Sequence, residues 1–309
     1  MQITSLEQYL SEVKKVALSD VETAFPNVYY RGEANVEWKA EASLFRGKIG
    51  EDSFYKDVNY TKEGDLIASA LIQYPQAFEK CPNAISRLVL MQHYGLPTRL
   101  YDVTANPLVA LFFACNMEFD KNGKVLFTKP GLDLYSSDFV NPLAELNEEI
   151  ENNGIILTLD NLLSYCIKKN LVHEGQEEAF AKKLFINVTK SFLFQPPLDN
   201  ERIQRQKGAM IFSSLLTMPD KLAEENYKKL EQKKGLCDEM KRFLFMRGEV
   251  NLREMFADEE FIIPKRCKKK ILKELEMVGI NEASVYPELE HQFKTIKYQN
   301  VPQNNWIKN

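Results

Sequence analysis

The stretch MQHYGLPTRLYDVTANPLVALFFAC, residues 91–115, joins a dense polar cluster to an almost wholly apolar run. Four polar side chains, His93, Arg99, Asp102 and Thr104, fall within a dozen positions. Because the chain has only three histidines, a histidine inside this cluster marks a candidate functional site.

Two helices are predicted to flank the polar cluster. Apolar residues recur at helical spacing over 84–94, which predicts a first helix that ends at Gly95. A second helix is expected to begin near Pro107, with Thr104 or Asn106 as its N-cap. Its interior, LVALFFAC, is apolar on every side and is therefore expected at the centre of the core. The segment GLPTRLYD is interpreted as the turn between the two helices.

The rest of the chain predicts an α+β fold. Strands are expected at VYYRG (28–32), KVLFTK (124–129), GAMIF (208–212) and EFIIPK (260–265). Helices are expected after an N-cap at Ser5, within 60–80, and from 266 to a cap at Gly279. No Ser/Gly/Pro-rich linker divides the chain, so residues 1–309 are interpreted as one domain, with a helical insertion at about 133–190 and a charged helical segment at about 220–258.

Composition excludes several functional classes. The net charge of -4 gives no general attraction to nucleic acid or to an anionic membrane, and the longest apolar run is too short to span a bilayer. The five cysteines are scattered, no metal-ligand spacing appears, and the GxxxxGK, GxGxxG and GxSxG motifs are absent. With no secretory leader at the start, a cytoplasmic protein without a metal or a membrane partner is expected.

Arg31 and Gly32 form a candidate ligand-binding pair at the end of a predicted strand. A guanidinium offers a forked donor to phosphate or ribose oxygens, and a glycine lets a ligand approach the backbone closely. A turn arginine that pairs with a local carboxylate is an alternative explanation.

The polar cluster also has two interpretations. His93 is a candidate general base, and the helix N-terminus at 104–107 suits a phosphate. Alternatively, His93 is a hydrogen-bonded core residue, and Arg99 pairs with Asp102 only to fix a corner.

Two further segments are rich in polar or basic residues. RIQRQKGAMIF (202–212) is interpreted as an entering strand that places Arg202, Gln204, Gln206 and Gly208 on one face, although a polar edge strand explains it as well. KRCKKKILK (265–273) predicts a helix whose lysines face solvent, with a phosphate-backbone contact surface as the alternative.

Several of these segments together resemble the FRG domain, a bacterial family named for its (F/Y)RG motif. The matching pieces are VYYRGEA, SLFRG, the 91–115 stretch and RIQRQKGAMIF, and the ending LKELEMVGINEASVYPELE is also typical of the family. The family is mostly described without a function.

A second resemblance, to ADP-ribosyltransferases of the arginine-motif class, supplies chemistry. In those enzymes a strand ending in YRG begins the NAD site: the arginine contacts ribose and phosphates, and the next backbone group holds the nicotinamide amide. These positions correspond to Arg31 and Gly32. The enzymes also carry a Gln-x-Glu or Glu-x-Glu strand, but here Gly208 stands where the glutamate is expected, so Asp102 or Glu33 would have to replace it.

The resemblance therefore implies an ADP-ribosyltransferase-like split β-sheet surrounded by helices, with NAD as the substrate. The expected catalytic residues are Arg31, Asp102, Gln206 and His93, and the expected NAD-binding residues are Tyr30, Arg31, Gly32, Glu33, Arg46, Arg99 and Thr104. The acceptor would be a nucleic acid or a protein, in a toxin or phage-defence setting with an antitoxin or regulatory protein as partner. The alternative is a non-catalytic module that binds a nucleotide, a nucleic acid or a partner protein.

Overall fold

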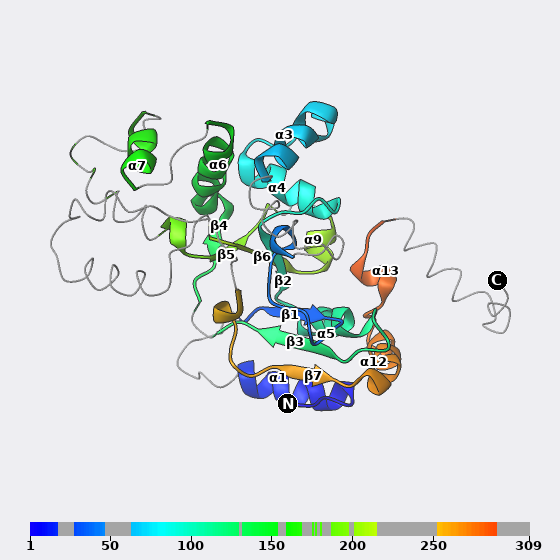
Figure 1. Cartoon of the computed structure of the whole chain (residues 1–309). Helices are drawn as coiled ribbons and strands as arrows, with labels where there is room; N and C mark the ends of the chain where they lie inside the picture. The colour runs from blue at the N-terminus through cyan, green and yellow to red at the C-terminus, as the bar shows by residue number, and fades with distance from the viewer. Residues whose placement is uncertain are drawn as a thin grey trace, which may run out of the picture.

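A seven-stranded mixed sheet forms the centre of the computed structural model, within the residues it describes (Figure 1). These are residues 1–17, 28–46, 63–129, 132–153, 159–168, 187–197, 201–214 and 252–288, with 175, 177 and 180. The strand order is β4-β5-β6-β2-β1-β3-β7. The strands are β1 (Tyr30–Glu33), β2 (Leu100–Thr104), β3 (Gly123–Phe127), β4 (Tyr135–Ser136), β5 (Phe192–Gln195), β6 (Gly208–Phe212) and β7 (Phe261–Ile263). A seven-stranded open mixed sheet with helices around it is compatible with the predicted α+β class.

The sheet consists of two halves that meet at one residue pair. β2 pairs with β6 from Leu100↔Phe212 to Thr104↔Gly208, and β1 pairs with β3 along its whole length. Between β1 and β2 the described register contains the single pair Tyr30↔Thr104. We call this place, where the two strands meet and then diverge, the strand junction. In Figure 1, β1, β3 and β7 form the lower half, and β2 runs upward from them toward α4.

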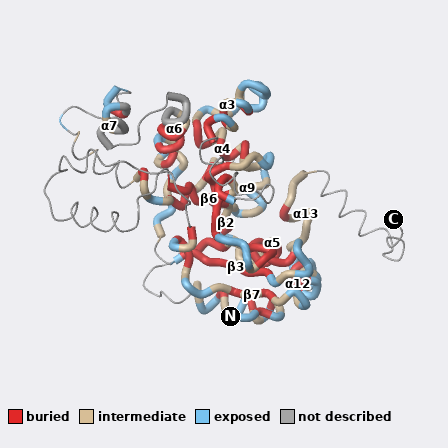
Figure 2. Tube along the Cα trace, viewed as in Figure 1, coloured by how far each residue is buried: buried red, intermediate tan, exposed pale blue. Residues whose placement is uncertain are grey.

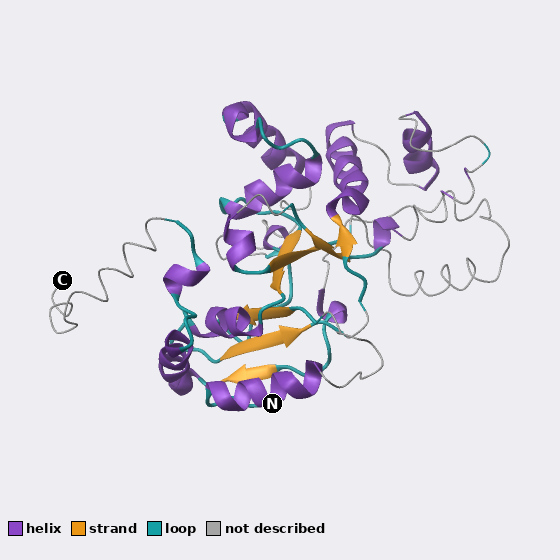
Figure 3. Cartoon of the chain, turned by 180° about the vertical axis from the view of Figure 1, so that it is seen from behind, coloured by secondary structure: helices purple, strands orange, loops and turns teal. Residues whose placement is uncertain are grey.

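Helices cover each half separately (Figures 1 and 3). Beside the β2 half lie α3 (Glu63–Gln73), α4 (Ala84–His93) and α6 (Ser137–Asn153), and beside the β1 half lie α1 (Leu6–Ala17), α5 (Pro107–Cys115) and α12 (Lys265–Met277). The shorter or peripheral helices are α7 (Leu159–Lys168), α9 (Glu201–Arg205) and α13 (Glu282–Val285), with 3₁₀ turns η1 (Ser43–Phe45), η2 (Pro75–Phe78) and η3 (Leu252–Met255).

Three apolar clusters form the core. One lies between α3, α4, α6 and the β2 half, and a second lies between α1, α5, α12 and the β1 half. The third contains residues of both halves, among them Tyr29 and Leu126 from one and Tyr101 and Ile211 from the other. Figure 2 shows the buried positions concentrated on the strands and on α5. The third cluster therefore joins the two halves where backbone pairing does not.

α5 lies directly on the backbone of the sheet. Asn106 caps it, accepting a hydrogen bond from the Leu108 amide at 3.0 Å, and Pro107 occupies its first turn. A Cβ added at Gly32 would lie 1.8 Å from the Ala110 carbonyl oxygen, and one added at Gly123 would lie 2.2 Å from that of Ala114. The predicted buried helix is thus present, and the two glycines set how closely it approaches the sheet.

Most predicted elements are confirmed, but two predictions at the edges of the polar clusters are wrong. GLPTRLYD is not only a turn: its second half begins the central strand β2. Residues 201–205 are the helix α9, not an entering strand, so the shared face predicted for Arg202, Gln204, Gln206 and Gly208 does not exist. Strand β6 begins only at Gly208, after Lys207, whose φ is positive at 46°.

The two predicted additions are only partly within the described residues. In the 133–190 region, α6 contributes Val140, Leu143, Ala144 and Leu146 to the core beside α3 and α4. Most of the 220–258 segment lies outside the described residues. Among the helices that the structure describes, none combines the length and apolar character needed to cross a bilayer.

Candidate functional site

Arg31 and Asp102, 71 positions apart in sequence, meet at the strand junction. The Arg31 side chain extends from β1 to β2, where its Nη1 donates to the backbone oxygen of Asp102 at 3.0 Å. The same Nη1 lies 3.8 Å from Oδ2 of the Asp102 carboxylate, and the guanidinium lies 4.5 Å from the centre of the Tyr101 ring. The structure thus brings together the two groups on which the expected site depends.

The two candidate acids differ sharply in exposure. The Asp102 side chain is 47% exposed, whereas that of Glu33 is 1% exposed. Oε1 of Glu33 accepts a hydrogen bond from the Tyr101 hydroxyl at 2.7 Å, and its Oε2 lies 3.4 Å from Nζ of Lys124. Burial and the neighbouring Glu33 raise the pKa of Tyr101, so this hydroxyl stays protonated and donates. Asp102 is therefore the acid within reach of a ligand, and Glu33 is a buried anchor for Tyr101 and Lys124.

A second arginine adds positive charge beside Arg31. Nε of Arg46 donates to the Glu41 carbonyl at 3.0 Å in a partly buried hydrogen bond. Burial and the charge of Arg31 both lower the pKa of Arg46. Burial opposes the charged form of Arg31, but Tyr101, Asp102 and Glu33 together raise the pKa of Arg31. Two guanidinium groups close to each other create a local positive potential that favours an anionic ligand.

Arg31 also keeps unused hydrogen-bonding capacity. Its Nε is buried and has no hydrogen-bond partner among the described residues. A buried donor without a partner costs about 1–3 kcal/mol, and such groups recur at binding sites. Oε1 of Glu33 lies 4.0 Å from this donor, too far for a hydrogen bond.

Gln92 holds the Asp102 carboxylate, a role that the sequence analysis did not predict. Its Nε2 donates to Oδ2 of Asp102 at 3.1 Å. Its Oε1 accepts from the hydroxyls of Thr98 at 2.7 Å and Ser43 at 3.3 Å. Gln92 lies three positions after Val89, a buried residue of the apolar face of α4. In the sequence, a polar glutamine at a position where the helix repeats apolar residues, directly before His93, could have indicated this role.

The other expected site residues, His93, Thr104 and Gln206, contact the segments around α9 and α13. The Thr104 hydroxyl donates to the Gln206 carbonyl, and Nε2 of Gln206 donates to the Val285 carbonyl at 3.3 Å. Nε2 of His93 lies 3.9 Å from Oε1 of Glu288. Burial and the nearby Arg202 lower the pKa of His93, while Glu288 and Asp102 oppose this shift. His93 is therefore neutral near pH 7, the form a general base needs.

Arg99 does not lie at the strand junction. It is 5% exposed and binds the Glu63 carboxylate through Nε and Nη2. Its remaining donors bind the Ser214 carbonyl and the side-chain oxygen of Asn147. The expected Arg99–Asp102 pair is absent because Glu63 takes the guanidinium. Arg99 joins β2 to α3 and α6, and this geometry argues against a ligand-binding role.

Tyr30 and Gly32 lie on the other face of β1, against α5. Tyr30 is 3% exposed, and burial raises its pKa to about 12. The carbonyl of Ala110 fills the space where a side chain at Gly32 would lie, so no ligand approaches from that face. The peptide group of Gly32 is oriented differently. The Thr128 amide donates to Tyr29 at 2.8 Å, which directs the Tyr29 carbonyl toward β3, and the alternation of an antiparallel ladder then directs Gly32 toward the strand junction.

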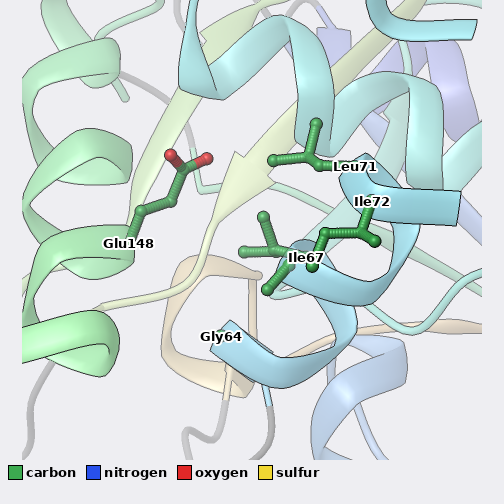
Figure 4. Close-up of a pocket in the computed structure, with 6 residues that line it drawn as sticks. Gly64, Ile67, Leu71, Ile72 and Glu148 are labelled. Atoms are coloured by element: carbon green, nitrogen blue, oxygen red, sulfur yellow. The ribbon is translucent and has the colours of Figure 1, made fainter. Parts of the chain in front are cut away.

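Two surface hollows have linings that include neither Arg31 nor Asp102. One, of about 200 Å³, lies between α3 and α6 and is lined by apolar side chains with Glu148 at its edge (Figure 4). The other, of about 430 Å³, lies beside the loop 36–41, with Lys124 and Arg253 in its lining. Within the described residues, no group of acidic, histidine or cysteine side chains is arranged to hold a metal ion.

Comparison with known proteins identifies one family. The family model described as FRG domain matches residues 26–123, a segment that contains β1, β2, α4, α5 and both Arg31 and Asp102. No curated protein and no solved structure matches the chain.

Proposed function

Because the chain carries an FRG domain at residues 26–123, we propose that this domain binds NAD at the strand junction and transfers its ADP-ribose group. The meeting of Arg31 and Asp102 is the main support. An exposed carboxylate held by Gln92 lies 3.8 Å from a guanidinium that has a buried donor to spare.

Each group at the junction has a task in this proposal. Arg31 and Arg46 bind the phosphates, for which a forked and permanently charged donor is well suited. The peptide group of Gly32 faces the same space and binds the nicotinamide amide. Asp102 stabilises the positive charge that develops on the ribose as its bond to nicotinamide breaks.

The transfer itself is a substitution at the ribose. The bond between the ribose C1′ and the nicotinamide nitrogen breaks, and nicotinamide leaves with the electron pair. An oxygen or nitrogen of the acceptor forms the new bond to C1′, and its proton passes to a base, for which His93 is the candidate. The acceptor, a nucleic acid or a protein, and a role as a toxin or phage-defence effector under an antitoxin or regulatory partner remain part of the hypothesis.

A non-catalytic module is the second candidate, and Gly208 favours it. β6 begins at Gly208, which pairs with Thr104 next to the strand junction, where the related enzymes carry a glutamate. If Asp102 does not replace that carboxylate, the same residues bind a nucleotide without turning it over.

The test measures NAD binding by calorimetry and nicotinamide release by chromatography. We expect Arg31→Ala to weaken NAD binding at least about tenfold, since it removes a charged hydrogen-bonding partner. Asp102→Asn keeps the shape and leaves binding within about threefold, but it lowers nicotinamide release about 10²–10³-fold because a charge-stabilising group is lost.

Arg87→Ala is the matched control. Arg87 has almost the same side-chain exposure as Arg31, 22% against 21%, and also pairs with a carboxylate, that of Glu148. This variant should bind and turn over NAD as the wild type does. Saturable binding without release would identify the non-catalytic module, and a wild type that binds no NAD would refute the enzyme and any module whose ligand is NAD.

A further inference from the structure

The carboxylate of Glu288 occupies a cationic position next to the proposed site. Its Oε1 lies 3.7 Å from Nη1 of Arg202 and 3.9 Å from Nε2 of His93. Both distances exceed those of a good hydrogen bond. Oε2 is buried and has no hydrogen-bond partner among the described residues. The charge of Arg202 thus attracts the carboxylate, whose oxygens lack a hydrogen bond of good length among the described residues.

The chain just before Glu288 is firmly attached. Asn281 and Ser284 form a capping box at the start of α13. Arg205 donates to the Ala283 carbonyl at 3.0 Å, and Val285 is buried. Tyr286 packs its ring edge-on against Phe112 and Phe113 of α5, with the Arg202 guanidinium 5.0 Å from the ring centre. Among the described residues, these contacts hold 281–286, and Glu288 lies two positions beyond the last of them.

We propose that Arg202 and His93 form an anion subsite, and that Glu288 occupies it as an internal competitor until an anionic ligand displaces it. A phosphate group is the chemical class that fits best. It carries more charge than a carboxylate and offers more acceptor oxygens, and Arg202 presents a forked donor to them. A ligand oxygen would also replace Oε2 of Glu288. While Glu288 occupies the subsite, this oxygen has no hydrogen-bond partner among the described residues.

The subsite lies next to the strand junction through α4. His93 directly follows Gln92, which holds the Asp102 carboxylate, and the Asp102 charge contributes to the pKa of His93. Through Gln92 and Asp102, the anion subsite is thus connected to the strand junction. The identity of the ligand as a dinucleotide rests on the proposed function, whereas the subsite and its occupant follow from the contacts alone.

The experiment titrates inorganic pyrophosphate into the full chain by calorimetry. Glu288→Gln keeps the size of the side chain and removes its charge, and we expect it to bind pyrophosphate at least about fivefold more tightly than the wild type. Glu276→Gln is the control, because Glu276 is an exposed acid on α12 whose loss changes the net charge equally. It should bind pyrophosphate as the wild type does.

A double variant assigns the gain to the subsite. Adding Arg202→Gln to Glu288→Gln should abolish the tighter binding. A gain that survives in the double variant, or that Glu276→Gln reproduces, would show a general charge effect and overturn the proposal, as would an unchanged affinity in Glu288→Gln. If Glu288→Gln lowers the melting temperature, Glu288→Ser repeats the test with a smaller side chain.

NAD turnover, measured on the same proteins, separates this inference from the proposed function. If Glu288→Gln binds pyrophosphate more tightly but no protein releases nicotinamide, the anion subsite is supported and the proposed enzymatic activity is refuted. If wild type and Glu288→Gln release nicotinamide equally and bind pyrophosphate with equal affinity, the enzymatic activity is supported. The role of Glu288 as an internal competitor is then refuted.

Discussion

Gly32 and Arg31 are adjacent in β1 but act on opposite faces of the sheet. Arg31 extends to Asp102 at the strand junction, while Gly32 brings the β1 backbone against the α5 backbone. The sequence analysis placed Arg31 and Asp102 in one expected site, and the structure brings their side chains within 3.8 Å of each other. The sequence was not sufficient to predict the partner of Arg99, because Glu63 lies 36 positions away and approaches only through the packing of α3.

Gly32→Ala tests the tight contact between β1 and α5. The new Cβ would overlap a backbone oxygen that no rotamer change can move, so we expect the free energy of unfolding to fall by about 4 kcal/mol or more. Gly208→Ala is the control, because the nearest atom to a Cβ there is a side-chain carbon of Ile203 at 3.4 Å. Its effect should stay below about 1 kcal/mol. Urea unfolding measures both, and a Gly32→Ala protein as stable as Gly208→Ala would contradict the packing described.

Among the elements, α12 departs most clearly from its predicted surface. Its apolar face is as expected, with Ile271 and Leu275 buried, but one lysine of the basic run is also buried. Nζ of Lys268 donates to the carbonyls of Ala34, Met117 and Glu118 at 2.6–2.9 Å. These carbonyls follow β1 and α5. The periodicity of α12 cannot reveal that carbonyl groups after β1 and α5 need a hydrogen-bond donor. The buried role of Lys268 was therefore not predictable.

Lys268→Met keeps the aliphatic stem and removes the donor. Three carbonyls would lose a charged partner, so we expect stability to fall by about 3 kcal/mol. Lys269→Met, on the exposed side of the same helix, should change stability by less than about 0.5 kcal/mol. Thermal and urea unfolding provide the measurement. Equal stability of the two variants would mean that Lys268 contributes no more than a surface lysine.

The strand β2 was not predicted either, because its environment also depends on a distant part of the chain. Its sequence LYDVT contains good strand formers, but Gly95 and Pro97 just before it and Pro107 just after it indicated a connection between helices. Only the pairing with β6, more than a hundred positions later in the chain, makes the segment a central strand. Residues 201–205 were assigned the wrong element because the polar residues there fit either period over so short a stretch.

At the scale of the whole molecule, the third apolar cluster connects two half-sheets that share one backbone pair. Phe256 is fully buried in this cluster; its backbone forms an isolated bridge with Thr128, and its ring lies 6.1 Å from that of Tyr101. One residue thus contacts both halves, one through its backbone and the other through its ring. The prediction of a single domain depends on connections of this kind.

We therefore expect both halves to unfold in one transition. Hydrogen exchange measured by mass spectrometry should give peptides from β3 and from β6 the same free energy of opening. Phe256→Ala should lower both values together, by about 3–5 kcal/mol. Separate values for the two halves, or a loss confined to one of them, would show that each half folds as an independent unit.

The glycine contacts beneath α5 have a consequence for how this architecture can diverge. Peptide groups, which are the same in every protein, determine the spacing between this helix and the two strands under it. Exchanges among apolar residues can reshape the remaining interior over time, yet they cannot lift or lower this helix. Distant descendants of the chain should therefore preserve the position of its axis even after most of their other buried residues have been replaced.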